Sequence, residues 1–566
     1  MNSLKKLFWP RYLSLTIAVL ATVLMAWVVL GSYVRLPTAP MMGGWHPVTM
    51  WGQVFCWVLL AIAASLTILG LHDLVQERHA ILRNYPIAGH IRFLFENIRP
   101  EMRQYFFETD KDGTPFSRDQ RAIVYQRAKE VLDKRPFGTQ LDVYQAKYEW
   151  LHHSLAPRPL NRDPVRVTIG GAECTQPYEA SLFNISAMSF GSLSANAVMA
   201  LNKGAKLGGF AHDTGEGGYT PYHEQNGGDI IWELGSGYFG ARNTDGSFSP
   251  EKFQERASHP QIKMVELKLS QGAKPGHGGV LPAAKITPEI SKIRGIEMGR
   301  DCISPSFHPA FSTPREMLQF VAEMRRLSGG KPAGFKLCIG HPWEFLAIVK
   351  AMLETGLLPD FIVVDGKEGG TGAAPLEFMD HVGTPLQDGL TFVHGALVGA
   401  GLRDKIKVGA SGKIITAFDM ARTLALGADW CNAARGFMFA VGCIQAQTCH
   451  TGRCPTGVTS QDPSRSRALV VEDKAERVAN FHHETLASLA ELVAAAGLDH
   501  PNQFMPHHFM RRVTADRMLS YAEIFPLSRP GELLEAAPDH PRYKEAWALA
   551  DPDSFQPRLP LATTGS

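Results

Sequence analysis

The sequence predicts an α/β protein in which a (β/α)8 TIM barrel follows a transmembrane helical hairpin. Two observations support this fold class. Between residues 161 and 470, short apolar segments that end in glycine, serine or aspartate alternate with longer segments of helical period. Within the first 72 residues, two stretches carry no charged side chain, and each is long enough to cross a bilayer as a helix.

The two apolar stretches cover residues 12–34 and 48–71, so residues 1–72 are expected to form the hairpin. A signal peptide is the alternative for the first stretch, but it lacks a clear cleavage site and a second stretch follows directly. The loop between them holds only Arg35, whereas basic residues flank the pair on its outer sides. The positive-inside rule then places both termini and the remaining chain in the cytoplasm, tethered to the cell membrane. The flanking residues are Lys5, Lys6, Arg11, Arg78 and Arg83.

The remaining chain divides into a helical connector (73–160), the barrel (161–470) and a C-terminal helical cover with a tail (471–566). An open, doubly wound sheet is the alternative to the barrel. Eight strand–helix units over this length, with polar residues at the strand ends, favour the barrel. The predicted strands are 183–187, 209–213, 264–269, 301–304, 333–338, 361–365, 405–410 and 428–434.

Composition excludes two classes of protein. The formal net charge is only +2, so nucleic acid is not expected as a partner. Eight cysteines in 566 residues are too sparse for a disulfide scaffold.

Glycine clusters follow several predicted strands. Glu216 stands in such a cluster after the second strand, and Gly370 and Thr371 follow the sixth. In barrels, the loops after the last two strands often bind phosphate through backbone N–H groups and a nearby cation. A phosphorylated cofactor is therefore expected at this rim. The candidates after the seventh and eighth strands are Gly412, Lys413 and Arg435.

Two further positions fit a flat cofactor ring. Met188, Ser189 and Gly191 close the first strand and could lie along such a ring. Lys336 stands within the fifth strand, where a side chain facing the barrel interior needs an anionic partner. It could stabilise negative charge on a flavin, or pair with a structural carboxylate, and the sequence does not separate these two roles.

A polar glycine-rich loop follows the strand 264–269. Lys274 lies in this loop, and Arg294 follows twenty residues later. The two cations could clamp a dicarboxylate, with arginine supplying two parallel hydrogen bonds. Solvated loop cations are the simpler alternative.

Cys443, Cys449 and Cys454 form a close trio within the loop 443–454. Three thiols this close can converge on one soft metal centre, either zinc or an iron–sulfur cluster. His450 could supply a fourth ligand to zinc. Three unrelated buried thiols are the remaining alternative. Three ligands rather than four favour a cluster that lacks one iron, and hence an electron-transfer site.

Taken in order, these motifs resemble the FMN-binding synthase domain of the glutamate synthase family. The likeness runs from about residue 180 to 500. It rests on NISAMSFGSLS, DTGEGG, ELKLSQGAKPGHGG, ISPSFH, VVDGKEGGTGAAP, the SGK turn and CIQAQTCHTGRCPTGVTSQ.

The resemblance implies FMN, a [3Fe–4S] cluster on the three cysteines, and reduction of 2-iminoglutarate, formed from 2-oxoglutarate and ammonia, to L-glutamate. Substrate binding falls on Gln271, Lys274 and Arg294, with Glu216 among the catalytic residues. The FMN contacts fall on Met188, Ser189, Gly191, Glu216, Lys336, Gly370, Gly412 and Arg435.

The chain also departs from the family pattern. His277 and Val280 replace a glutamate and a substrate-contacting glutamine, and Ala434 and Arg435 replace a Gly-Thr-like pair. The sequence shows neither an N-terminal glutaminase nucleophile nor a G-x-G-x-x-G strand-to-helix unit for a nicotinamide cofactor. Ammonia from solution and electrons from ferredoxin or a separate reductase are therefore expected.

Three functions remain open. The first is glutamate synthesis from 2-oxoglutarate and ammonia. The second keeps the same redox centres but uses another 2-oxoacid or amine donor, as the residues at 277 and 280 suggest. The third is a membrane-tethered electron-transfer subunit without a substrate of its own, and the retained Lys274 and Arg294 argue against it.

Overall fold

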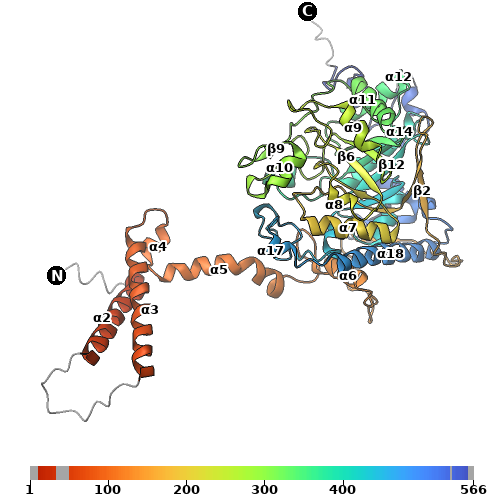
Figure 1. Ribbon diagram of the computed structural model, residues 1–566. Helices are drawn as coiled ribbons and strands as arrows, with labels where there is room; N and C mark the ends of the chain where they lie inside the picture. Colours follow the sequence, from red (N-terminus) through yellow and green to blue (C-terminus); the bar gives the residue numbers. More distant parts are fainter. Residues whose placement is uncertain (1–9, 34–49, 536–537, 559–566) are drawn as a thin grey trace, which may run out of the picture. The chain divides into compact units, whose positions relative to one another are not determined.

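The chain forms two structural units (Figure 1). The first comprises Met1–Gly113 and the second Thr114–Ser566. The structure is a computed structural model, and it describes residues 10–33, 50–535 and 538–558.

The first unit is built on two long apolar helices, α2 (Leu13–Tyr33) and α3 (Met50–Val75). They pack against each other, and the hydroxyl oxygens of Thr22 and Thr67 lie 2.9 Å apart between them. Both helices are long and apolar enough to cross a membrane. This confirms that the two apolar stretches form helices, and that they cross a membrane stays a prediction. The loop that joins them and the lysines before α2 lie outside the described residues. Shorter elements complete the unit: η1 (Pro10–Tyr12), α4 (Ala80–Asn84), α5 (Ala88–Met102) and the π turn η2 (Arg103–Phe107).

Eight parallel strands close into a barrel in the second unit, and the last strand pairs with the first. This confirms the (β/α)8 fold class. In barrel order the strands are β4 (Phe183–Ile185), β5 (His212–Asp213), β6 (Ile230–Leu234), β7 (Ile262–Lys268), β10 (Ala333–Leu337), β11 (Phe361–Asp365), β12 (Lys407–Ser411) and β13 (Trp430–Ala433).

One predicted strand is wrong, and one barrel strand escapes the prediction. The segment 301–304 lies outside the barrel, where β9 (Cys302–Ile303) pairs antiparallel with β8 (Val280–Leu281). The missing strand is β6, which pairs with β5 and β7. A short apolar segment followed by a turn looks the same in either setting, so only long-range pairing separates them. Strands five to eight keep their predicted places.

Helices surround the barrel, and smaller elements cover its ends. Figure 1 shows α18 lying along α7, and a Cβ at Gly204 of α7 would lie 2.4 Å from Val478, so only glycine allows this approach. The main helices are α6 (Arg118–Ala128), α7 (Ala195–Gly208), α8 (Pro221–Glu224), α9 (Pro250–Ala257), α10 (Pro288–Arg294), α11 (Pro314–Leu327), α12 (Pro342–Thr355), α13 (Leu376–His381), α14 (Leu386–Gly399), α15 (Ala417–Ala425), α16 (Arg435–Ala440), α17 (Pro463–Ser466), α18 (Val471–Ala495), α19 (Tyr521–Ile524) and α20 (Lys544–Leu549). The 3-10 turns are η3 (Ala283–Lys285), η4 (Cys449–Thr451), η5 (Pro501–Gln503), η6 (Pro506–His508) and η7 (Glu532–Leu534), and the additional strands are β1 (Glu149–Leu151), β2 (Arg166–Ile169), β3 (Tyr178–Ser181), β14 (Phe509–Arg512) and β15 (Met518–Ser520).

Two layers of side chains fill the barrel, because alternate residues of a strand point to the same face. The layer nearer the amino-terminal ends of the strands, called the lower layer, is apolar and packs against the hairpin β2–β3. Two residues farther along each strand, the side chains become polar and charged. The lower layer contains Ala211, Ile231, Met264, Val363 and Trp430, and the polar layer contains Asp213, Glu233, Glu266, Lys336, Asp365, Ser411 and Asn432.

Candidate active site

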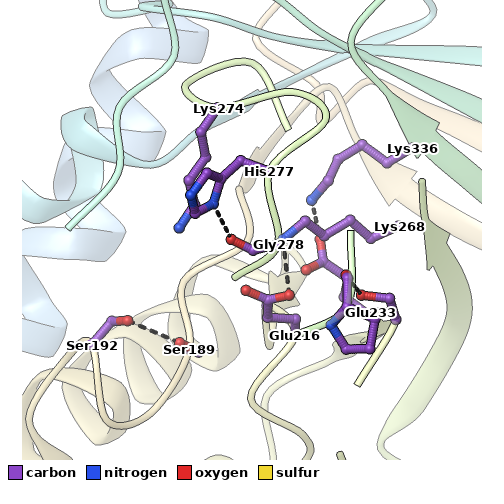
Figure 2. A network of polar contacts seen from close by, with 12 residues as sticks. Ser189, Ser192, Glu216, Glu233, Lys268, Lys274, His277, Gly278 and Lys336 are labelled. Carbon is purple, nitrogen blue, oxygen red and sulfur yellow. Dashed lines mark hydrogen bonds and ion pairs between the residues drawn. The ribbon is translucent and has the colours of Figure 1, made fainter. Parts of the chain in front are cut away.

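The polar layer holds a buried lysine among three carboxylates. The Nζ of Lys336 contacts Glu233 (Figure 2). It also lies 3.3 Å from Glu266 Oε1 and 4.0 Å from Asp213 Oδ2. All four side chains are buried. The structure therefore provides the anionic partners that the sequence demands of Lys336.

The charges in this cluster do not cancel if every group is ionised. Burial alone would lower the pKa of Lys336, but Glu233 and Glu266 raise it well above its usual value. Burial raises the pKa of Asp213 strongly and that of Glu266 to about 7, and each is further raised by the neighbouring carboxylates. At neutral pH the lysine is thus charged, and the carboxylates share at least part of one proton.

Two adjoining cavities open above the polar layer. The inner cavity has Lys336 and Asp365 in its lining. The outer cavity has Glu233 and Lys268 in its lining. They share five residues, so a ligand could extend from one into the other. The shared residues are Ala187, Gln271, Gly370, Ala434 and Arg435.

The inner cavity is bounded by the turns after β11, β12 and β13. Gly412 has a φ of +152° and Lys413 a φ of +50°, so the turn exposes backbone in a conformation that non-glycine residues seldom adopt. The Lys413 ammonium stands over the Phe116 ring, 5.5 Å from its centre. Arg435 joins two of the turns, because its Nη2 donates to the Thr371 carbonyl at 2.6 Å.

The outer cavity is strongly polar on one side. Lys268 and Glu216 form a 3.0 Å ion pair (Figure 2). Burial alone would raise the pKa of Glu216, but Lys268 holds it below its usual value. Lys274 is buried, and its Nζ donates to the Ala373 carbonyl at 3.2 Å. Burial lowers the pKa of Lys274 to about 8, despite the opposing effect of Glu216.

The loop after β4 contributes a second side of the outer cavity. Met188 and Ser189 line it, and the Ser189 hydroxyl donates to Ser192 Oγ at 3.0 Å. Gly191 has a φ of +98° and lines neither cavity. Arg294 also lies outside both linings. Its Nη2 donates to the Phe190 carbonyl at 2.9 Å and to Ser189 Oγ at 3.3 Å.

The three predicted metal ligands line one small cavity. Burial raises the pKa of Cys443. Burial would also raise that of Cys454, but hydrogen bonds from Thr456 and neighbouring groups lower it. His450 lines the outer cavity and not this one.

Comparison with known proteins decides the family. A family profile described as the conserved region in glutamate synthase matches residues 138–499. The chain belongs to the glutamate synthase family.

Relatives place the chain among shorter family members. It is 40% identical over 483 residues to the glutamate synthase large subunit-like protein YerD of Bacillus subtilis, covering 78% of this chain and 91% of that one. It is 36% identical over 320 residues to an archaeal glutamate synthase (NADPH) of Methanocaldococcus jannaschii, covering 56% of this chain and 59% of that one. A solved flavocytochrome b2 mutant with pyruvate bound aligns over 74% of this chain and 85% of that one, at 12% identity and a TM-score of 0.39. That likeness is too distant to carry functional information.

The family pattern differs at two residues whose positions the structure now gives. Val280 lines the outer cavity, so the glutamine expected there is replaced by an apolar wall. His277 turns back on its own loop, where its Nδ1 lies 2.8 Å from the Gly278 carbonyl oxygen, and it packs against Phe378 (Figure 2). The departures therefore change the outer cavity at position 280 and the supporting loop at position 277.

Several residues of the site escape the sequence-based prediction: Asp213, Glu266, Lys268, Asp365, Glu233 and Lys285. Glu233 belongs to the unpredicted strand β6, where a lone acid within an apolar segment could have drawn attention to it. Lys285 is buried between the outer cavity and the cysteine loop 443–454, and its Nζ donates to Ser192 O at 2.8 Å and Cys449 O at 3.3 Å. Burial lowers the pKa of Lys285 to about 8. Nothing in its local sequence marks it as a site residue.

Proposed function

We propose that the chain is a membrane-anchored, glutamate synthase-type oxidoreductase that reductively aminates a 2-oxoacid, with 2-oxoglutarate as the first candidate. The observation that carries this proposal is the pair of adjoining cavities beside the cysteine loop. A flat, phosphorylated cofactor can extend along the inner cavity, a small anion can enter the outer cavity, and a metal cluster can lie close to both.

The inner cavity suits FMN. The backbone at Gly412 and Lys413 is open for a phosphate, as in barrels that bind phosphate after the seventh and eighth strands. Gly370 lies against Arg435, where a Cβ would come 2.9 Å from Nε, so the wall is too close for a larger residue. When bound, FMN supplies a hydride to an imine carbon. The charged Lys336 below it would favour negative charge on the reduced ring.

The outer cavity suits a 2-oxoacid. Lys274 offers an ammonium to a carboxylate, and Gln271, whose side chain lies at the boundary of both cavities, offers an amide. Arg294 holds the Ser189 loop against this cavity and so positions its wall. Ammonia adds to the carbonyl with loss of water, and the resulting imine accepts the hydride and a proton to give the amino acid.

The cysteine trio suits a three-cysteine iron–sulfur cluster. Three cysteine ligands rather than four favour the [3Fe–4S] type over zinc. Electrons would then reach FMN from ferredoxin or a separate reductase through this cluster.

Membrane anchoring rests on α2 and α3. Only 22% and 11% of their most apolar windows are buried, whereas the core helix of a soluble protein would be largely covered. Two successive spans also argue against a cleaved signal sequence. The basic residues on the outer flanks of the pair favour a cytoplasmic barrel.

One experiment tests the redox proposal. The full chain is purified without oxygen, its iron and flavin are measured, and the reduced protein is offered a series of 2-oxoacids with and without ammonia. Reoxidation of the flavin by 2-oxoglutarate and ammonia together is the expected result. Well-folded protein that holds neither flavin nor iron would contradict the proposal.

A second candidate is the same chemistry on a different 2-oxoacid. Val280 favours it, because an apolar side chain in the outer cavity lacks the amide that the family uses toward its substrate. In the same experiment, reoxidation by a more apolar 2-oxoacid, with little response to 2-oxoglutarate, would select this candidate.

A further inference from the structure

Helix α5 and the π turn after it carry an exposed apolar stripe. Its residues recur at intervals of three and four, so they lie on one side of the helix. Each is at least 38% exposed in the structure. This stripe, called the α5 face, consists of Ile91, Leu94, Phe95, Ile98, Met102, Tyr105 and Phe106.

The other side of α5 is polar. Arg92, Arg99 and Arg103 follow one edge of the α5 face at helical spacing, and Arg92 pairs with Glu96 at 2.8 Å. Residues 88–108 contain three arginines and three glutamates, so the helix has no net attraction for an acidic surface. The helix is therefore amphipathic, but its polar side carries no excess of positive charge.

The start of α5 is fixed to the end of α3. Asp73 of α3 is fully buried. Its Oδ2 accepts a hydrogen bond from the Ile87 N–H at 2.9 Å, and both of its carboxylate oxygens lie 3.0 Å from His90 Nε2. Because the Asp73 carboxylate is buried, the loss of either hydrogen-bonding partner would leave a buried charge unsatisfied. These contacts, called the Asp73 joint, therefore hold the start of α5 against the end of α3. Figure 1 shows α5 running crosswise to α3 from this joint.

We propose that the α5 face lies in the membrane–water interface, with its apolar side chains inserted at the boundary between headgroups and acyl chains. The inference rests on the proposed membrane anchoring, because α3 must first bring the helix to the bilayer surface.

A lipid surface fits these observations better than a protein partner. The α5 face begins sixteen residues after the end of α3, and the Asp73 joint holds it crosswise to a candidate span. Aromatic side chains close the stripe, as is usual at headgroup level. Arginine stems along one edge can cover apolar surface while their charges reach water. An amphipathic helix of this kind lies in the plane of the interface.

Photo-crosslinking to lipid tests the proposal on the full chain. A diazirine amino acid is introduced at Phe95 or Ile98 in the α5 face, and at Asn97 on the opposite side as the matched control. A fourth position, Leu24 in α2, reports the membrane span itself. Each variant is reconstituted in nanodiscs of phosphatidylcholine alone or with phosphatidylglycerol, and lipid adducts are measured by mass spectrometry.

Severalfold more lipid adduct at Phe95 and Ile98 than at Asn97 is expected, with little effect of phosphatidylglycerol. If Leu24 labels lipid while Phe95 and Ile98 crosslink to another part of the chain or to a second copy, the proposed interface is overturned and the anchoring stands. If Leu24 also fails to label lipid, both proposals fall.

Discussion

Replacing Lys336 by methionine should destabilise the barrel unit severely. The substitution removes the positive charge that Glu233, Glu266 and Asp213 surround. Methionine keeps a similar volume, so the change isolates charge from packing. Breaking a buried ion pair on one side typically costs about 3–5 kcal/mol, because the remaining charges lose their partner.

The same reasoning predicts a partial rescue. The double variant Lys336→Met/Glu233→Gln removes the carboxylate that contacts the lysine and leaves Asp213 and Glu266, whose pKa values are already raised and which can protonate. It should therefore be more stable than Lys336→Met alone, by about 1–3 kcal/mol of coupling free energy.

Thermal unfolding followed by circular dichroism measures these differences within one series. For a unit as long as Thr114–Ser566, a loss of about 3–5 kcal/mol corresponds to a midpoint lowered by roughly 3–5 °C, because the unfolding entropy is about 2.1 cal/mol/K per residue. Lys331 is the matched control, because it is also buried but donates to the carbonyls of Ala257 and His259 rather than to acids. Adding Glu233→Gln to Lys331→Met should restore no stability. Equal stability of Lys336→Met and the parent, or equal rescue of both lysine variants, would refute the charge argument.

Three other changes test neighbouring parts of the site. Burial and the neighbouring carboxylates raise the pKa of Glu266 to about 7, from an ordinary value of 4.5. Protonated Glu266 therefore stabilises the fold fully below about pH 4.5, and this stabilisation is lost as the pH rises through 7. Glu266→Gln should flatten that part of the curve of stability against pH, measured beside the parent protein. Lys285→Met should lower the reduction potential of the proposed iron–sulfur cluster, because it removes a buried positive charge beside Cys449, whereas the exposed Lys292→Met should not; redox titration followed by electron paramagnetic resonance compares them. Val280→Gln should raise kcat/KM for 2-oxoglutarate about tenfold, by restoring a hydrogen bond to a charged group, and an unchanged ratio would count against a substrate contact at this position.

The sequence predicts the barrel well because its strand–helix alternation is local. The residues at the rim of the barrel can be predicted for the same reason, because glycine and polar residues directly follow each strand in the sequence. Gln271, Lys274, Gly370 and Arg435 thus meet at the two cavities, as expected. The predicted role of each remains to be tested.

The errors share a different cause, because they depend on contacts distant in sequence. Strand β6 is five fully buried residues, a length and pattern that fit a strand or part of a helix equally well, and only its pairing with β5 and β7 identifies it. Because the prediction omits β6, it also omits Glu233. Lys285 is invisible for the same reason, since its importance comes from the Cys449 carbonyl 164 residues away.

The segment that enters the barrel unit is itself part of the site. Phe116 lines the inner cavity and packs under Lys413. The Phe116 N–H donates to Gln445 Oε1 in the cysteine loop at 3.2 Å, and Gln445 Nε2 donates to the Phe116 carbonyl at 3.0 Å. The Tyr125 hydroxyl donates to the Cys443 carbonyl at 2.6 Å. One short stretch thus contacts both the expected phosphate turn and the expected metal loop. Displacement of residues 114–125 would therefore disturb both of these loops together.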